Sequence, residues 1–326
     1  MSEKLSERKP PGEYEWQVTE KIRETHDTYT YTLTPISASQ RFTFGIGQFV
    51  TLSAMLKRPI ASGSFEESIV NRAYSIASSP TRDLIELTIK EEKPYGYINP
   101  ATGKSDAFAA YFNQQVKIGD KIKLKLNPSK EHFLSKVDSG IEKNIAYWSG
   151  ANGAQSARCL IQYMEDKKDP EQNLVLFYSN TKLAIDGANE VNNSDHFPVE
   201  SLNVIYYHWL MDAAEKLDNL KVIFTFTREQ DIPTASKDSR VVFRKGRFFV
   251  NPDGTPEQTL SKYGINIETS FNPVCGSSAF INGTVRLPDG TINKGKGILQ
   301  NLIELEGIIP EKTDKEQFYL QQVGAN

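Results

Sequence analysis

Cysteine and histidine are both scarce in this sequence. The 326 residues include two cysteines, Cys159 and Cys275, which are too few for a disulfide framework, a four-thiolate zinc site or an iron–sulfur cluster. The four histidines share no spacing that is typical of a metal site. Any redox chemistry in this chain would therefore need an organic cofactor.

An excess of one charge and long apolar runs are also missing. The chain has 38 Lys and Arg residues and 41 Asp and Glu residues, so the net charge is −3 and no general positive field attracts a polyanion. We therefore expect no nucleic acid as the main partner. No apolar run approaches the roughly 18 residues of a membrane span, and the start of the chain lacks the apolar core of a secretory signal. We expect a cytoplasmic protein with no membrane span.

The first part of the chain carries the pattern of an antiparallel β-barrel. A charged, flexible leader is expected over residues 1–13. From residue 14 to residue 140, five or six short runs of β-formers alternate with turn residues, and in one of them Tyr29, Tyr31 and Leu33 share a face. This part has too few helical segments to cover a parallel sheet, which favours an antiparallel barrel or sandwich. One short helix is expected over residues 105–116.

Residues 141–326 alternate between strand and helix patterns. This order predicts a doubly wound parallel sheet, whose ligands bind beyond the carboxyl ends of the strands. Two polar stretches within it are expected to be long loops or insertions, residues 183–202 and 229–262. The strands are expected at residues 144–150, 174–180, 221–229 and 271–278.

The segment from Asn71 to Pro80, NRAYSIASSP, carries the most specific motif. On a strand, Arg72 and Tyr74 point to one face, where a guanidinium can grip a pyrophosphate and a phenol can cover a planar ring. The segment resembles the flavin-binding signature of the ferredoxin–NADP reductase superfamily. The resemblance implies an FAD-binding β-barrel over residues 14–140 and an NAD(P)-binding α/β domain over residues 141–326. It also places Ser75 beside the reactive flavin N5, with Ala73, Ile89 and Lys90 among the FAD-binding residues.

The short helix departs from the family pattern. Relatives usually carry Gly-x-x-Ser at its start, where it captures the flavin pyrophosphate, and here Ala109 stands where the Ser is expected. Backbone amides at a helix N-terminus can hold a phosphate without that hydroxyl. Ala107, Phe108 and Ala109 are therefore candidates for binding FAD.

The turn from Ser149 to Gln155 occupies the place of the family's glycine-rich nucleotide loop. In the ungapped alignment one of three family glycines is kept, Asn152 replaces another, and the family proline becomes Gln155. A small, glycine-bearing turn before a helix still suits phosphate capture, which makes Gly150, Asn152 and Gly153 candidates. Nicotinamide binding and a degenerate pocket both remain open.

Two later strand ends also resemble the family. Ser179 and Lys182 follow one strand and Arg228 follows the next, where relatives meet the adenosine ribose and its phosphate. The segment Val274-Cys275-Gly276 resembles the family's Cys-Gly-Pro-Pro, in which the thiol lies near the nicotinamide. The resemblance implies NADP or NAD as the second cofactor and leaves the choice between them open.

The carboxyl end resembles the Glu-x-Phe or terminal-aromatic endings of relatives. By this resemblance Glu316 would relay a proton and Phe318 or Tyr319 would shield the flavin. Before it, the basic glycine turn over residues 293–298 is either an anion site or a solvated loop.

The resemblance implies a flavin-dependent oxidoreductase that transfers electrons between NAD(P)H and a one-electron carrier such as ferredoxin or a flavodoxin-like protein. Because the cysteines are too few for a cluster, the carrier is expected on another polypeptide. One alternative is an NAD(P)H-dependent reductase of a quinone, flavin or ferric acceptor. The other is a flavin-binding electron-transfer or regulatory subunit with a degenerate nucleotide pocket.

Overall fold

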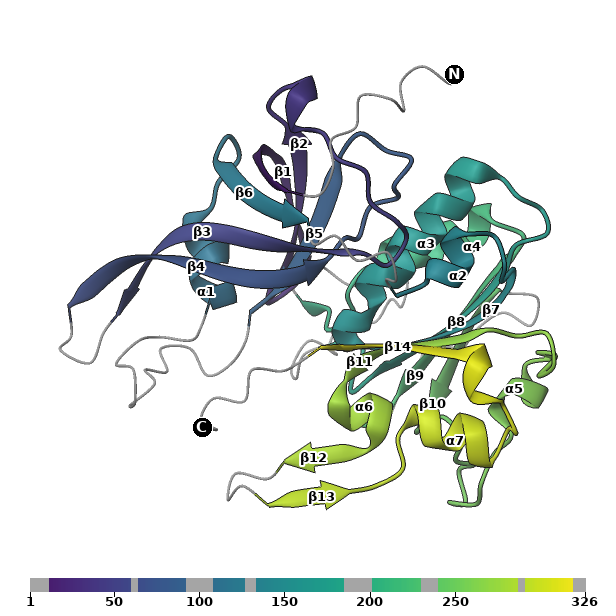
Figure 1. The fold of residues 1–326 in the computed structure, drawn as a ribbon. Helices are drawn as coiled ribbons and strands as arrows, with labels where there is room; N and C mark the ends of the chain where they lie inside the picture. The colour runs from purple at the N-terminus through teal and green to yellow at the C-terminus, as the bar shows by residue number, and fades with distance from the viewer. Residues whose placement is uncertain are drawn as a thin grey trace.

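The first domain is a six-stranded antiparallel sheet, curled into a barrel (Figure 1). The computed structural model describes residues 12–59, 64–91, 108–126, 133–184, 201–229, 240–286 and 291–318. The sheet has the strand order β4-β3-β6-β1-β2-β5, and the predicted antiparallel architecture is confirmed. Its strands are β1 (Glu13–Thr25), β2 (Thr28–Pro35), β3 (Phe49–Pro59), β4 (Phe65–Ser75), β5 (Ile85–Lys90) and β6 (Lys121–Leu126), with a 3-10 turn η2 (Ala38–Gln40) after β2.

Helix α1 (Phe108–Gln115) packs against the barrel core and is fixed there by Lys21. The ammonium group of Lys21 donates to the carbonyl oxygens of Asn113 at 2.5 Å and Val116 at 3.1 Å, where the helix ends. It also lies over the rings of Tyr29 and Tyr31. A cation at a helix C-terminus satisfies carbonyl groups that the helix leaves unpaired. Helix and barrel are therefore joined by charge as well as by apolar packing.

The second domain is a six-stranded parallel sheet with helices on both faces, which confirms the predicted doubly wound sheet (Figure 1). Its strand order is β10-β9-β8-β7-β11-β14. The strands are β7 (Asn144–Gly150), β8 (Asn173–Asn180), β9 (Leu220–Phe226), β10 (Val241–Lys245), β11 (Asn272–Ser277) and β14 (Thr313–Phe318).

The helices form two layers around the parallel sheet. Figure 1 shows α2 (Ser135–Asp138), α3 (Ala154–Lys167) and α4 (Tyr207–Lys216) on the side of the barrel. The opposite side carries α5 (Thr259–Lys262), α6 (Ser278–Asn282), α7 (Ile298–Glu304) and the hairpin β12 (Thr284–Arg286) and β13 (Ile292–Lys294). Short 3-10 turns, η3 (Ala151–Gly153) and η5 (Pro310–Lys312), precede α3 and β14. No helix among the described residues is long and apolar enough to cross a membrane.

The expectation of one long loop over residues 229–262 is wrong in part. Strand β10 lies within it and pairs in parallel with β9, from Val241 beside Val222 to Lys245 beside Phe226. Helix α5 also lies within it. The short run VVFRK gains its strand conformation from this long-range pairing, which local composition does not display. The other expected loop, residues 183–202, lies mostly outside the described residues, as do residues 1–11 of the expected leader.

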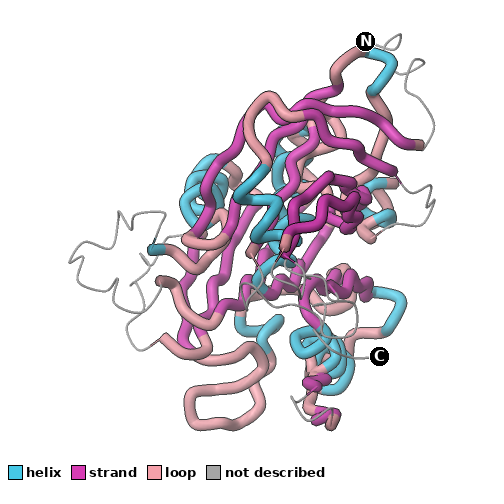
Figure 2. Tube along the Cα trace, turned by 90° about the vertical axis from the view of Figure 1, so that its left-hand side faces the viewer, coloured by secondary structure: helices cyan, strands magenta, loops and turns pink. Residues whose placement is uncertain are grey.

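The two domains meet through buried polar contacts between β5 and α3. Arg158 makes two hydrogen bonds to the carboxylate of Glu86, at 3.0 and 3.1 Å, and Gln162 donates to the same carboxylate at 2.9 Å. The guanidinium also lies over the rings of Tyr206 and Trp209. Figure 2 shows the same pair of domains turned by 90°. This buried pair and Gln162 therefore lie at the junction of the two domains.

Candidate functional site

A cavity of about 340 Å³ lies at the carboxyl ends of the parallel strands. In the strand order, β8, β9 and β10 follow one another outward from one edge of β7. The chain then returns and places β11 along the other edge of β7. In open α/β sheets such a reversal of strand order creates a ligand-binding crevice. The cavity lies there, lined by Lys90, Gly150, Ala151, Asn152, Ser179, Asn180, Thr181, Asn203, Thr227, Ser277 and Phe280.

Lys90 brings the barrel into this cavity. It is the last residue of β5, and its ammonium group lies 3.5 Å from the carboxylate of the buried Asp27. The other lining residues come from the second domain. Four candidates from the sequence, Lys90, Gly150, Asn152 and Ser179, therefore share one cavity between the domains. No signal in the sequence other than their place at strand ends singled out Asn180, Thr181 or Thr227.

The turn between β7 and α3 carries polar atoms that lack protein partners. Ser149 Oγ, Asn152 Oδ1 and Gln155 Oε1 are buried without a hydrogen-bond partner among the described residues. Unpaired buried polar atoms are rare in folded proteins, so each one requires an explanation. Three such atoms on one seven-residue turn fit a bound group that brings hydrogen-bond donors, as a nucleotide does.

Gln155 has a role that the sequence did not reveal. Its side-chain amide donates to the carbonyl oxygen of Thr88 on β5 at 2.8 Å, so the residue in the place of the family proline links the turn to the barrel. Gly153 leaves room for close packing, since a Cβ there would collide with the carbonyl oxygen of Cys275. Ala151 adopts a left-handed conformation with φ of 46°, which is uncommon for a residue with a side chain. The turn is therefore strained as well as altered in sequence.

Cys275 lies in the core and not on the cavity wall. Its side chain is fully buried with Cys159 among the apolar residues under α3. The lining of the cavity does not include it. The place of the thiol beside the nicotinamide, implied by the family resemblance, stays a prediction. Gly276, the next residue, lies under the ring of Phe280.

Lys182 and Arg228 lie just beyond the cavity. Each follows a lining residue, Thr181 or Thr227, and the backbone N–H of Arg228 donates to the carbonyl oxygen of Thr181 at 2.8 Å. The two cations therefore occupy adjoining segments after β8 and β9. This is where a group extending out of the cavity along the strand ends would meet positive charge.

The barrel brings Arg72, Tyr74 and the start of α1 together, as the resemblance requires. The guanidinium carbon of Arg72 lies 5.6 Å from the ring centre of Phe108, and the ring centre of Tyr74 lies 6.2 Å from it. Arg72 and Tyr74 are both half-buried, so one part of each side chain faces outward. A cation, a phenol and a helix start in one place can hold a phosphate and cover a flat ring.

The remaining barrel candidates differ in position. Ser75 is buried and Ala73 is exposed, although both lie on the same face of β4, because only the end of the strand at Ser75 is covered. Ala109 is buried in the barrel core. The side chain of Ile89 is fully buried in the same core and leaves its backbone available to a ligand, so its place among the FAD-binding residues stays a prediction. Ala107 lies outside the described residues.

The carboxyl segment forms the edge strand of the parallel sheet. In β14, Glu316 pairs with Cys275 and Phe318 pairs with Ser277 on β11. The expected closing tail is thus a strand as far as residue 318, and Tyr319 lies outside the described residues. The proton relay at Glu316 and the ring shield at Phe318 stay predictions.

The basic glycine turn near residue 295 serves packing. A Cβ on Gly283 or Gly297 would collide with backbone atoms of the neighbouring segment. The backbone N–H of Gly295 donates to the carbonyl oxygen of Gly283 at 2.8 Å. Lys296 pairs with Glu304 at 2.6 Å. These contacts hold the end of α6 and explain Gly283 and Gly297, while the anion site and the solvated loop both stay predictions for this turn.

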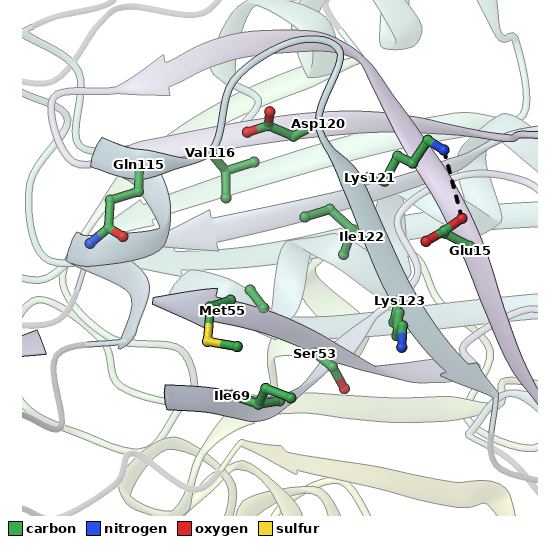
Figure 3. Close-up of a pocket in the computed structure, with 11 residues that line it drawn as sticks. Glu15, Ser53, Met55, Ile69, Gln115, Val116, Asp120, Lys121, Ile122 and Lys123 are labelled. Atoms are coloured by element: carbon green, nitrogen blue, oxygen red, sulfur yellow. Dashed lines mark ion pairs between the residues drawn. The ribbon is translucent and has the colours of Figure 1, made fainter. Parts of the chain in front are cut away.

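A second hollow of about 520 Å³ lies on the barrel (Figure 3). It opens where β3 and β6 separate beyond the pair Ser53 and Lys123, with the exposed Met55 and Ile69 on one side. None of the residues predicted to bind a cofactor lines it. The cavity at the strand ends is therefore the candidate site.

Several solved protein structures share the fold of this chain. No model of a protein family and no curated protein matches the chain. The FAD/NAD-binding domain of a nitric oxide dioxygenase from Vibrio cholerae O1 biovar El Tor matches with a TM-score of 0.59 at 14% identity, covering 95% of this chain and 99% of that one. A ferredoxin–NADP+ reductase from Neisseria gonorrhoeae, solved with FAD and NADP bound, gives 0.56 at 14% identity, covering 94% and 99%. The cytochrome b5 reductase domain of Ulva prolifera nitrate reductase gives 0.53 at 17%, covering 83% and 90%.

The chain has the two-domain fold of these reductases. At identities of 14% and 17%, the fold is what they share, and it extends over nearly the whole chain. The predicted resemblance to the ferredoxin–NADP reductase superfamily is confirmed at this level. Within the reductase fold, the cavity between Lys90 and the strand ends lies where its barrel and its parallel sheet meet.

Proposed function

We propose that the chain is an FAD-dependent oxidoreductase that transfers electrons between NAD(P)H and a separate one-electron carrier, such as ferredoxin or a flavodoxin-like protein. The observation that carries the proposal is the cavity at the reversal of strand order, where Lys90 of the barrel meets the ends of β7, β8, β9 and β11. A flavin held by the barrel and a nucleotide held by the sheet would meet at this place.

On the barrel side, Arg72, Tyr74 and the start of α1 would hold FAD. The half-buried guanidinium supplies charge-assisted hydrogen bonds to phosphate, and the phenol supplies an aromatic face for a ring. Ser75, buried beside them on β4, would donate or accept one hydrogen bond at the ring edge. Bound FAD would supply the exchange between a two-electron donor and a one-electron acceptor.

On the sheet side, the turn from Ser149 to Gln155 would hold the nucleotide. The unpaired oxygens of Asn152 and Gln155 accept hydrogen bonds, and Lys90 provides positive charge within the same space. Lys182 and Arg228 favour NADP, since a 2′-phosphate on the adenosine ribose pairs with cations. The domain contacts of Arg158 and Gln155 keep these groups and the barrel in a fixed relation.

The experiment is an anaerobic titration of the purified chain with NADH and with NADPH, followed by visible absorption. We expect a bound flavin spectrum that bleaches with NADPH at lower concentration than with NADH. Steady-state rates with ferredoxin, flavodoxin, quinone and ferric acceptors then identify the acceptor. A chain that binds no flavin after reconstitution with FAD contradicts the proposal at its first step. Faster rates with quinone or ferric acceptors than with ferredoxin or flavodoxin contradict the one-electron carrier as the acceptor.

A second candidate is a flavin-binding electron-transfer or regulatory subunit without nucleotide turnover. The ring of Phe280 over Gly150 favours it, because the ring reduces the room for a dinucleotide. This candidate predicts a yellow protein that neither NADH nor NADPH bleaches. The same titration therefore separates the two functions.

A further inference from the structure

The ring of Phe280 lies on both glycines at the reversal of strand order. A Cβ placed on Gly150 would be 2.7 Å from this ring, and one placed on Gly276 would be 2.9 Å from it. Gly150 ends β7 and Gly276 lies near the end of β11, so the ring covers the seam between the two strands. In folds of this kind, backbone without side chains at that seam lets a dinucleotide approach closely. Here an aromatic side chain of the protein occupies the approach.

Phe280 is not locked in the core. It is half-buried and forms part of the cavity wall together with Ser277 and Gly150. Its aromatic ring therefore has apolar neighbours on one side and the cavity on the other. Such a ring can change rotamer into open space, whereas a fully enclosed core ring cannot do so without disturbing its neighbours.

The helix that carries Phe280 is held by contacts that do not involve the ring. At its start, the hydroxyl of Ser277 accepts a hydrogen bond from the backbone N–H of Phe280 at 3.3 Å. At its end, Gly283 takes a left-handed conformation and packs against the backbone of Gly295 and Gly297. Removing or turning the ring therefore leaves α6 in place.

We propose that Phe280 is a gate over the nucleotide site, whose ring covers Gly150 and Gly276 until an NAD(P) dinucleotide displaces it. The inference rests on the proposed function, because it assumes that a dinucleotide binds at this seam. When the competent form of a site is only a fraction of the population, the apparent Kd is the intrinsic Kd divided by that fraction. If the ring covers the glycines about nine times in ten, removing it tightens binding about tenfold.

The test is isothermal titration calorimetry of the flavin-loaded protein with NADP+ and NAD+, which reports binding without turnover. Phe280→Ala is compared with wild type, and Phe280→Leu is the second variant in case the alanine protein does not fold. The matched control is Phe243→Ala, which removes a partly buried ring from β10, three strands away from β7 in the same sheet. Thermal unfolding of every variant is recorded alongside.

We expect Phe280→Ala to lower the Kd about tenfold, Phe280→Leu to lower it by a smaller factor, and Phe243→Ala to leave it unchanged. The gate is overturned, and the proposed function left intact, if wild type binds as tightly as Phe280→Ala or more tightly. Where Phe280→Ala does not fold, the same comparison is made with Phe280→Leu. Equal tightening in Phe243→Ala also overturns it, because general loosening of the domain then explains the effect. Absence of binding in wild type and in every folded Phe280 variant overturns both the gate and the nucleotide half of the proposed function. Binding by Phe280→Ala alone supports the gate.

Discussion

Replacing Glu86 with Leu is expected to destabilise the protein strongly, because it strands a buried charge between the domains. Arg158 is 7% exposed, and its two hydrogen bonds to Glu86 are 3.0 and 3.1 Å long. Burial disfavours the charge of Arg158, but attraction to Glu86 outweighs this and raises its pKa, so the guanidinium stays charged. Removing one partner of a buried pair costs about 3–5 kcal/mol. We expect a loss of this size in the free energy of unfolding.

The assay is urea unfolding at pH 7 followed by circular dichroism. Arg82→Met is the matched control, because Arg82 also joins the barrel to α3, through Glu165 and Asp166, but its side chain is 32% exposed. A pair as exposed as this contributes about 1 kcal/mol or less. The double variant Glu86→Leu with Arg158→Met removes both charges and is expected to recover most of the loss.

Two results would refute this reasoning. The first is a loss below about 1 kcal/mol in Glu86→Leu, equal to that of the Arg82 control. The second is a double variant that is as unstable as Glu86→Leu, because the loss would then come from altered packing and not from an unpaired charge. Either result would mean that the pair contributes little to stability as a buried ion pair.

Three further predictions concern the site and its surroundings. Arg72→Ala should weaken flavin binding by about 1.5–3 kcal/mol, because charge-assisted contacts to phosphate are lost. The control Arg41→Ala, on the same barrel, should retain its flavin. Equal flavin content in the two variants after dialysis contradicts this prediction. Cys275→Ser puts a hydroxyl into the core and should lower the free energy of unfolding by about 1–3 kcal/mol without changing nucleotide affinity. Slower flavin reduction at unchanged stability would contradict this and assign the thiol to the functional site. Burial raises the pKa of Glu24 above its usual value of 4.5. The stability that the protonated side chain contributes is therefore fully present below pH 4.5 and is lost as the pH rises through the raised pKa. Glu24→Gln should therefore be more stable than wild type at pH 7 and equal to it at about pH 4, and a difference that does not change with pH refutes this.

The architecture could be predicted from the sequence because its signals are local. The alternation that places Tyr31 and Leu33 on one face of β2 is visible in a few residues, and both side chains lie in the barrel core. The flavin motif is also local, so Arg72 and Tyr74 could be named before their common neighbour Phe108 was seen.

The parts that escaped prediction depend on contacts between distant segments. Strand β10 exists because β9 lies beside it. Gln155 was noted only as the replacement of the family proline, yet its side chain donates to the carbonyl oxygen of Thr88, which is 67 residues earlier in the chain. Phe280 gave no signal of its own, because its position over Gly150 follows from the order of strands in the sheet. Residue type and spacing do not contain this information.

The buried pair between Glu86 and Arg158 also limits how this protein can be recombined. Each domain contributes one charge, so a chimera that combines this barrel with the parallel sheet of a relative inherits a carboxylate without its guanidinium unless that relative also has an arginine at the matching position of its first helix. If the two halves were expressed separately, each would expose one of these charges to water. Each charge would have to give up its hydration again when the halves join. The two domains are thus exchangeable only together with the residues of their shared interface, and a library of domain swaps should carry Glu86, Arg158 and Gln162 as one unit.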